Sequence, residues 1–266
     1  MVVIKDKKDM ETAPDTFLKN IPYKLMGKYD GLNFVDKDVR VLSVQFSKVG
    51  AKTYSAFPNL EWIIARSHGT DNINLDECDK RGIGVVSTKP YAKSTARWIK
   101  QFLQLEDIIG FIGHGAIASN INVFNNIIYN TQSSRDELIT LAKNVDTLVI
   151  TIPQTPETKH IIGEDVLSVF SGKIISVGRW DIIDNESLLK HIDRISYAVI
   201  DTLGKTKQQE LLATGKILYT KHTAWEYKFV YDEKYFQQLE TVINDCLNNN
   251  VKNPDLMRRR VVTLWD

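Results

Sequence analysis

Short runs of β-branched and aliphatic residues alternate with longer amphipathic stretches along most of this 266-residue chain. The runs that we interpret as strands are Val39–Phe46, Trp62–Ala65, Val85–Val86, Ile108–Ile112, Ile127–Tyr129, Thr147–Ile152, Lys173–Val177 and Tyr197–Ile200. Helical periodicity separates them, for example over 136–144, 186–191 and 234–247. Nearly continuous apolar strands that alternate with helices are typical of parallel sheets covered on both faces. The sequence therefore predicts a doubly wound α/β fold.

Two longer amphipathic stretches divide the chain. Residues 93–105 have apolar positions spaced for a helix with a broad buried face, and a second long helix is expected over about 227–247. Each would cross between lobes. We therefore predict two lobes, one built from both ends of the chain and the other from its middle.

The composition excludes several classes of protein. Lys and Arg (34) balance Asp and Glu (33), so no strong field would attract the chain to nucleic acid or to an anionic membrane. The two cysteines, Cys78 and Cys246, have neither the number of a disulfide scaffold nor the spacing of a zinc site. No apolar window approaches the length of a membrane span. We expect a cytoplasmic protein with a small-molecule partner and no metal, nucleic-acid or membrane site.

A glycine turn follows the run Ile108–Ile112. Gly113 and Gly115 match the first two positions of the dinucleotide fingerprint, and Ala118 occupies the third. The first glycine permits a tight turn, the second lets the backbone approach a pyrophosphate, and a small third residue lets a helix pack on the strand. The N–H groups of that helix would face the phosphates. The motif predicts a dinucleotide site, with a purely structural glycine turn as the alternative.

The run that ends at Tyr129 is followed by no acid. A carboxylate near Asn130 ordinarily binds the adenosine ribose, yet no Asp or Glu occurs between the glycine turn and residue 135. A carboxylate would repel the 2′-phosphate of NADP, whereas Asn130, Thr131 and Ser133 would not, and Arg135 could pair with it. The sequence therefore favours NADP slightly over NAD. In the alternative interpretation, Arg135 only caps the next helix.

Six segments, in order, resemble the D-isomer-specific 2-hydroxyacid dehydrogenases, the group that includes phosphoglycerate, glycerate, D-lactate and formate dehydrogenases. The segments are 58–73, 80–90, 152–162, 176–184, 200–201 and 221–224. The resemblance implies a Rossmann dinucleotide-binding domain (92–225) inserted in a smaller flavodoxin-like α/β substrate domain (1–91 plus 226–266). It also implies hydride transfer between NAD(P)(H) and a small 2-hydroxy or 2-oxo acid resembling glycerate, hydroxypyruvate or glyoxylate.

The resemblance assigns catalytic roles to Arg179 and His222. Arg179 follows a buried run, and its guanidinium fork suits a substrate carboxylate and a polarised carbonyl. His222 follows the run Ile217–Thr220, and an imidazole ordinarily exchanges its proton near neutral pH. In the alternative interpretation, Arg179 is a structural arginine paired with Asp181 or Asp184.

Further site residues are also expected from the resemblance. Backbone N–H groups of Ser67, His68 and Gly69 would bind the substrate carboxylate, and the His68 side chain either lines the pocket or belongs to an ordinary loop. The residues expected to contact the cofactor are Gly113, His114, Gly115, Ala116, Ile117, Asn130, Thr131, Ser133, Pro153, Thr158, Val177, Gly178 and Asp201.

Among the chain's departures from the family's pattern, two bear on catalysis and on assembly. Thr206 stands where the family has the glutamate that pairs with the histidine. Gln208 or Gln209 could serve instead, as glutamine does in formate dehydrogenases, if the loop register slips, and Glu210 is a further candidate unless it is an ordinary solvated carboxylate. Only Leu103–Asp107 separates the interdomain helix from the glycine-loop strand, where relatives place an arm that clasps a second subunit. A homodimer would therefore need another surface. Two alternative functions stay open: a catalytically weakened dinucleotide-binding regulatory protein, and a formate-type dehydrogenase.

Overall fold

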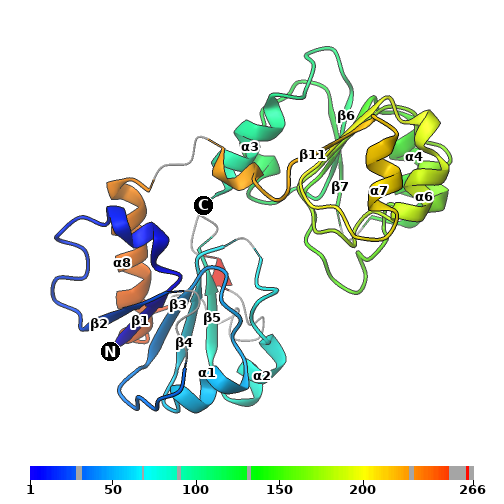
Figure 1. Cartoon of the computed structure of the whole chain (residues 1–266). Coiled ribbons are helices and arrows are strands. Elements are labelled where there is room, and N and C mark those ends of the chain that lie inside the picture. Colours follow the sequence, from blue (N-terminus) through cyan, green and yellow to red (C-terminus); the bar gives the residue numbers. More distant parts are fainter. Residues whose placement is uncertain are drawn as a thin grey trace. The chain divides into compact units, whose positions relative to one another are not determined.

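Two parallel β-sheets organise the chain, each in its own unit (Figure 1). The computed structural model describes residues 1–27, 32–67, 69–88, 91–130, 133–227, 231–251 and 262–263. One unit comprises Met1–Pro90 with Val230–Asp266, and the other comprises Tyr91–Phe229. The strands of both sheets are mainly buried and are covered by helices. The predicted α/β fold is thus confirmed.

The first unit has the strand order β12-β5-β4-β3-β1-β2. Its strands are β1 (Val2–Lys5), β2 (Tyr23–Met26), β3 (Val41–Val44), β4 (Trp62–Ala65), β5 (Gly84–Ser87) and β12 (Val262–Thr263). Its helices are the 3₁₀ helix η1 (Lys7–Thr12) and the α-helices α1 (Ala51–Ala56), α2 (Leu75–Lys80) and α8 (Glu233–Leu247). The order of β1 to β5 is that of flavodoxin-like sheets. The helices α1 and α2 share a core with one face of the sheet, and α8 covers the opposite face (Figure 1).

The second unit has the strand order β11-β10-β9-β8-β6-β7. Its strands are β6 (Ile109–Ile112), β7 (Asn126–Tyr129), β8 (Thr147–Ile150), β9 (Lys173–Ser176), β10 (Tyr197–Ile200) and β11 (Ile217–Tyr219). Its α-helices are α3 (Ala92–Lys100), α4 (Arg135–Lys143), α5 (Glu164–Leu167), α6 (Asn185–Lys190) and α7 (Gln208–Ala213). Its 3₁₀ helices are η2 (Ala118–Asn120), η3 (Ile192–Arg194) and η4 (Ala224–Glu226).

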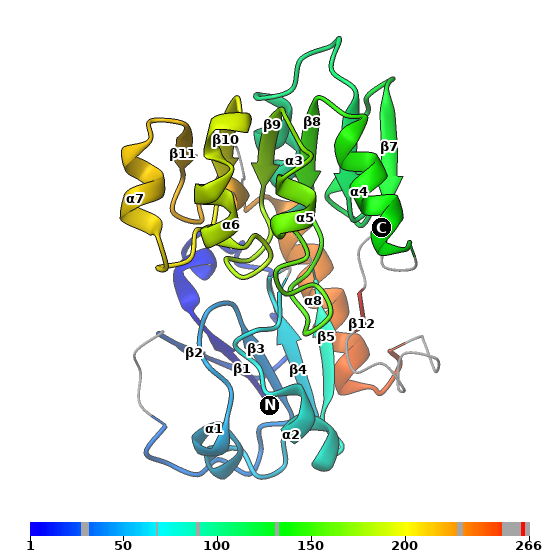
Figure 2. The same cartoon turned by 90° about the vertical axis from the view of Figure 1, so that its right-hand side faces the viewer.

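Separate apolar cores lie on the two faces of the second sheet. Residues of α4, α5, α6 and α7 pack on one face, and Figure 2 shows α4, α5 and α6 in front of the strands. On the other face, Trp98 and Ile99 of α3 pack with Phe111, Val149 and other strand residues. Because successive residues of a strand point to opposite faces, strands that are covered on both sides must be apolar throughout.

Several predicted elements differ from the observed ones. The helix predicted over 93–105 is the shorter α3, and that predicted over about 227–247 begins at Glu233, where the Asp232 side chain accepts the N–H of Tyr235. A helix was expected after the glycine turn, but only the three residues of η2 are helical there. Within the described part of the chain, no helix has both the length and the apolarity needed to span a bilayer.

Candidate functional site

The carboxyl ends of the strands in the second unit carry most of the predicted site residues. Ile150 pairs in register with Ile112 and with Ser176, and Ile200 pairs with Ser176 and with Tyr219. Strands in such register end together, so the residues that come after them lie along one edge of the sheet. In open α/β sheets ligands bind at this edge.

The glycine turn follows β6, whose neighbours β7 and β8 lie on opposite sides. Gly113 has φ +91°, and an added Cβ would lie 3.0 Å from the backbone N and Cα of Ile152. A side chain at Gly115, by contrast, would meet no atom within 4 Å. The protein therefore requires glycine at 113 for its own fold, whereas Gly115 leaves the backbone open to a bound group. His114 beside it is exposed, and Ala116 and Ile117 are half-buried.

The prediction of a helix after this turn is wrong, and the residues that follow the turn give the physical reason. The segment from Ile117 to Asn126 is rich in asparagine and β-branched residues, both of which favour helices weakly. Polar side chains also bond locally: Ser119 Oγ donates to the Gly115 carbonyl at 2.8 Å, and Asn120 Nδ2 to the Ala116 carbonyl at 2.7 Å. One 3₁₀ turn results, so few aligned helical N–H groups follow the glycine turn.

The edge expected to hold the adenosine ribose carries polar, uncharged groups. The N–H of Ser133 donates to the Asn130 carbonyl at 3.0 Å, and Asn130 is exposed. Thr131 lies outside the described residues. Arg135 forms a bidentate ion pair with Asp165, with a shortest distance of 2.5 Å, and also donates to the Ile161 carbonyl. This pair lowers the pKa of Asp165. The guanidinium that was expected to pair with a 2′-phosphate is thus already paired within the protein.

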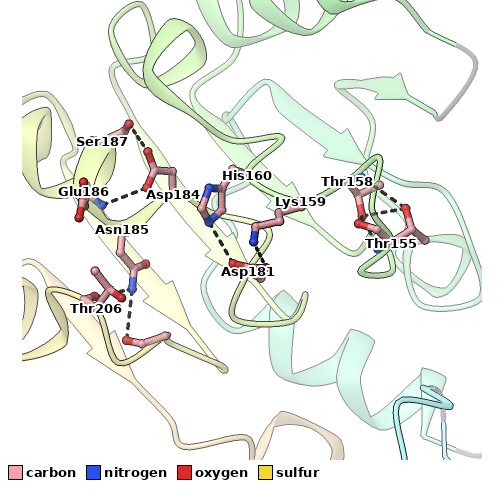
Figure 3. Close-up of polar contacts among 11 residues, drawn as sticks. Thr155, Thr158, Lys159, His160, Asp181, Asp184, Asn185, Glu186, Ser187 and Thr206 are labelled. Atoms are coloured by element: carbon pink, nitrogen blue, oxygen red, sulfur yellow. Dashed lines mark hydrogen bonds and ion pairs between the residues drawn. The ribbon is translucent and has the colours of Figure 1, made fainter. Parts of the chain in front are cut away.

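The loop after β8 is stabilised internally by Thr158. Its hydroxyl accepts the N–H of Thr155 at 2.7 Å (Figure 3). The same hydroxyl donates to the Pro153 carbonyl, also at 2.7 Å. Thr158 is buried, whereas Pro153 is exposed. The hydrogen bonds of Thr158 therefore shape the loop, and Pro153 is the member of the pair that is open to contact a ligand.

Arg179 and His222 meet although 43 positions separate them in the chain. Arg179 follows β9 and the short segment Val177–Gly178, and His222 follows β11. The Arg179 Nη1 atom lies 2.9 Å from His222 Nε2. A guanidinium and an imidazole thus lie together at the carboxyl edge of the sheet. Reduction of the oxo group of a 2-oxo acid requires such a pair: the guanidinium binds the negatively charged carboxylate, and the imidazole supplies a proton to the oxo group.

The acids near Arg179 are bonded to other groups. Asp181, 8% exposed, bonds His160 Nε2 at 2.9 Å and lies 3.3 Å from Lys159 Nζ (Figure 3). Asp184 caps α6 and accepts the N–H of the residue two positions on. Neither acid bonds Arg179 among the described residues, so the interpretation of Arg179 as their structural partner is wrong.

Asp201 follows β10 and is 2% exposed. Its Oδ1 atom accepts the Thr220 hydroxyl at 2.6 Å and the N–H groups of Thr223 and Ala224 at 2.9 and 3.0 Å. The indole N–H of Trp225 donates to the His222 carbonyl at 3.0 Å. Asp201 was expected from the family resemblance; Thr220 and Trp225 were not, because a hydroxyl and an indole beside a histidine carry no distinctive spacing.

The loop after β10 contains the position where the family has glutamate. Thr206 there is exposed, and its carbonyl accepts the buried Asn185 Nδ2 at 2.9 Å (Figure 3). The same amide donates to the Gly204 carbonyl at 3.2 Å. Gln208, a proposed replacement for the glutamate, directs its amide to the Leu203 carbonyl at 3.3 Å. Its amide therefore closes its own loop, and Gln209 is exposed.

In the first unit, Ser67 and Gly69 follow β4. The Ser67 hydroxyl donates to the Gly69 carbonyl at 2.7 Å, and the Ser67 carbonyl accepts the Ser87 hydroxyl at 2.8 Å. His68 lies outside the described residues. The preceding Arg66 is fully buried and donates to the Ser43 hydroxyl and to the Lys5 carbonyl, both at 2.8 Å. The loop thus starts from a rigid, hydrogen-bonded base.

Asp6 directly follows β1, so it lies at the same carboxyl edge of the first sheet as Ser67. Its Oδ2 atom accepts the N–H groups of Gln45, Phe46 and Ser47 at 2.8 to 2.9 Å, and Oδ1 accepts the Ser47 hydroxyl at 2.6 Å. Burial alone would raise the pKa of Asp6, but these four hydrogen bonds together lower it below its ordinary value. A carboxylate of the chain itself therefore fills this cluster of N–H groups.

Comparison with known proteins places these observations in a family. The pattern described as "D-isomer specific 2-hydroxyacid dehydrogenase, NAD binding domain" matches residues 72–224, and that described as "D-isomer specific 2-hydroxyacid dehydrogenase, catalytic domain" matches residues 9–96. Among curated relatives, glyoxylate/hydroxypyruvate reductase A of Arabidopsis thaliana is 25% identical over 222 residues, which cover 65% of this chain and 71% of that protein.

Solved structures share the fold. D-lactate dehydrogenase from Aquifex aeolicus, complexed with NAD and lactic acid, superimposes with a TM-score of 0.69 at 19% identity and covers 95% of this chain and 97% of its own. An NADPH-dependent glyoxylate/hydroxypyruvate reductase from Sinorhizobium meliloti, complexed with NADP and malonate, gives 0.67 at 20% identity, with 95% and 94% covered. Because the family patterns span well over half of its length, this chain belongs to the D-isomer-specific 2-hydroxyacid dehydrogenases, NAD(P)-dependent oxidoreductases that transfer a hydride between the nicotinamide and a small 2-hydroxy or 2-oxo acid.

Proposed function

We propose that this protein reduces a small 2-oxo acid, of the glyoxylate or hydroxypyruvate type, with Arg179 and His222 as its catalytic residues. The observation that carries the proposal is the 2.9 Å contact between Arg179 Nη1 and His222 Nε2 at the carboxyl edge of a dinucleotide-binding sheet. The names of the curated relatives, such as the Arabidopsis glyoxylate/hydroxypyruvate reductase, support this class of substrate.

The two side chains would divide the chemistry between them. The Arg179 guanidinium binds the substrate carboxylate and polarises the carbonyl. A bound nicotinamide would supply the hydride for the carbonyl carbon, and His222, in its protonated form, would give its Nε2 proton to the carbonyl oxygen, so that a hydroxyl forms. In the reverse direction His222 takes the hydroxyl proton. A positioned acid or base of this kind typically contributes about 10²- to 10⁴-fold to the rate.

The residues of the second unit fit a dinucleotide. Gly113 makes the tight turn, and the open side of Gly115 leaves its backbone accessible to a pyrophosphate. Exposed Asn130, with no acid in its place, would accept NADP as well as NAD. Because Arg135 is paired with Asp165, we infer that any preference for NADP depends on the missing carboxylate and not on this arginine.

The remaining assignments come from the resemblance. We propose that the unit formed by 1–91 plus 226–266 binds the substrate carboxylate through the loop of Ser67, His68 and Gly69. A cytoplasmic location agrees with two buried cysteines that form no disulfide, which a reducing compartment permits. Only eight residues, 101–108, separate α3 from β6, so a homodimer, if one forms, would not use the usual arm.

Oxidation of NADH and NADPH by glyoxylate, hydroxypyruvate and pyruvate tests the proposal. Wild-type protein is expected to turn over at least one pair. Arg179→Gln is expected to raise the KM for the oxo acid and to lower kcat, while cofactor binding measured by calorimetry is unchanged. Turnover by Arg179→Gln equal to that of wild type would contradict the assignment.

A second function is favoured by a departure at the site. The exposed Thr206 in place of glutamate would suit a dinucleotide-binding regulatory protein with weak catalysis. That function predicts tight cofactor binding with no turnover over the whole panel of oxo acids. Formate-dependent reduction of NAD(P)⁺ would instead indicate the formate-type enzyme, which the loop-bound Gln208 does not favour.

A further inference from the structure

The backbone at His222 adopts a conformation that non-glycine residues rarely adopt. Lys221 has φ +54° and His222 has φ +64°, so two consecutive non-glycine residues lie in the left-handed region. Such strained residues persist only where the surrounding structure determines their conformation, and they concentrate at functional sites. The contacts that hold this turn therefore decide where the imidazole points.

Both backbone polar groups of His222 are fixed. Its N–H donates to the Asp201 carbonyl at 2.6 Å, and its carbonyl accepts the Trp225 indole N–H at 3.0 Å. Trp225 is itself held by the start of α3. Its carbonyl accepts the Ser94 hydroxyl at 2.8 Å, and its ring packs against that of Tyr91 with centroids 4.7 Å apart.

The Asp201 carboxylate holds the turn on both sides of His222. Its Oδ1 atom accepts one side-chain donor from before the histidine, the Thr220 hydroxyl, and two backbone donors from after it, at Thr223 and Ala224. Its Oδ2 atom accepts no hydrogen bond from the residues that the structure describes. One oxygen thus holds the turn on both sides of His222.

We propose that Thr220 is a positioning residue for His222. Through Asp201 Oδ1 its hydroxyl fixes the left-handed turn that presents the imidazole Nε2 to Arg179, 2.9 Å away. The proposal rests on the proposed function, because it assigns Thr220 to the same site. Without the Thr220 hydroxyl, Asp201 Oδ1 accepts only the N–H groups of Thr223 and Ala224, which follow His222 in the chain. The imidazole would then sample other orientations and transfer its proton less often.

The chain contains a matched control. The Thr147 hydroxyl donates to Asp107 Oδ2 at 2.7 Å, so it is also a threonine bonded to a carboxylate in the second unit. Thr147 is fully buried and begins β8, at the amino end of a parallel strand, whereas Thr220 follows the carboxyl end of β11. The two threonines therefore share their bonding chemistry but lie at opposite edges of the sheet.

Steady-state kinetics of Thr220→Val, Thr220→Ser and Thr147→Val, on the full chain with the best oxo acid, test the proposal. Thr220→Val is expected to lower kcat by about tenfold or more, as misplaced catalytic groups do, with KM and Kd for the cofactor within about twofold of wild type. Thr220→Ser retains the hydroxyl and should restore most of kcat, and Thr147→Val should have wild-type kcat. Equal kcat in Thr220→Val and wild type, equal losses in both valine variants, or no rescue by serine would overturn the proposal.

A second measurement separates this proposal from the proposed function. If wild type turns over no oxo acid, the proposed function fails, but the His222 ring signals in ¹³C-edited NMR spectra still report its orientation. Thr220→Val should shift or broaden the His222 signal, assigned with His222→Gln, and leave that of His191 in place. Thr147→Val should move neither signal. An unchanged His222 signal in Thr220→Val would overturn the positioning role whether or not the protein is active.

Discussion

The two glycines of the predicted cofactor-binding turn differ in their surroundings. Gly113 adopts φ +91° and lies against the Ile152 backbone, whereas Gly115 has open space where a side chain would be. The fold therefore requires glycine at the first position, whereas the second position has room for a side chain. This distinction was not available from the glycine spacing, because spacing does not reveal what surrounds each Cα.

The glycine pair gives a residue-scale prediction. Gly113→Ala should lower the free energy of unfolding by about 1–3 kcal/mol, because a Cβ at this φ is strained and meets backbone. Gly115→Ala should leave the unfolding free energy within about 0.5 kcal/mol of wild type but weaken NAD(P) binding. Urea unfolding and calorimetric titration measure the two effects. Tight cofactor binding by Gly115→Ala would contradict the account of the open backbone.

Asp6 gives a second prediction at this scale. Its pKa is lowered in the folded state, so the carboxylate stabilises the fold above its ordinary pKa of 3.8 and loses that contribution as the pH falls below this value. Asp6→Asn should therefore lower the unfolding free energy at pH 7 by about 2 kcal/mol, since hydrogen bonds to a buried charge are lost. The difference from wild type should shrink below pH 3.8. Exposed Asp38 provides the control, because Asp38→Asn should leave the unfolding free energy at pH 7 close to that of wild type.

At the scale of elements, a clear apolar run decided which strands could be predicted, even at the mainly exposed β7. The bounds of β4 and β10 match their predicted runs residue for residue, since each has an apolar run bordered by polar residues. The strands β1 and β2 were not predicted. Three of the four residues of β2 are exposed, and buried and exposed positions do not alternate along it. Only the three residues of η2 are helical where a longer helix was expected after Gly115. The spacing of the glycines predicts the turn, but it contains no information on the helix propensity of the residues that follow.

The short η2 and the edge position of β7 lead to an element-scale prediction. Ile127 and Ile128 of β7 are 44% and 43% exposed although they point to opposite faces, whereas Ile174 of β9 is fully buried. Ile128→Thr should change the unfolding free energy by less than about 1 kcal/mol, and Ile174→Thr should lower it by about 2 kcal/mol or more. Urea unfolding of the two variants compares them directly. Equal losses would mean that another surface covers β7.

For the whole molecule, the alternation of apolar runs with helical stretches predicted the α/β class, and the order of motifs along the chain predicted the family. The ends of parallel strands meet at one edge, so motifs that come after strands were expected to meet. The sequence could not reveal which hydroxyls and amides bond inside the loops. Thr158 bonds within its loop, and Thr220 lies at the Asp201 carboxylate, although both are single threonines near strand ends.

The most direct test of the account compares His222→Gln with His191→Gln by NADH and NADPH oxidation in the presence of glyoxylate or hydroxypyruvate. His191 lies in the same unit but bonds Glu164, outside the Arg179 contact. The account predicts that His222→Gln loses about 10²-fold or more in kcat while cofactor binding persists, and that His191→Gln retains wild-type kcat. Wild-type turnover by His222→Gln would contradict the central claim that the imidazole facing Arg179 transfers the proton.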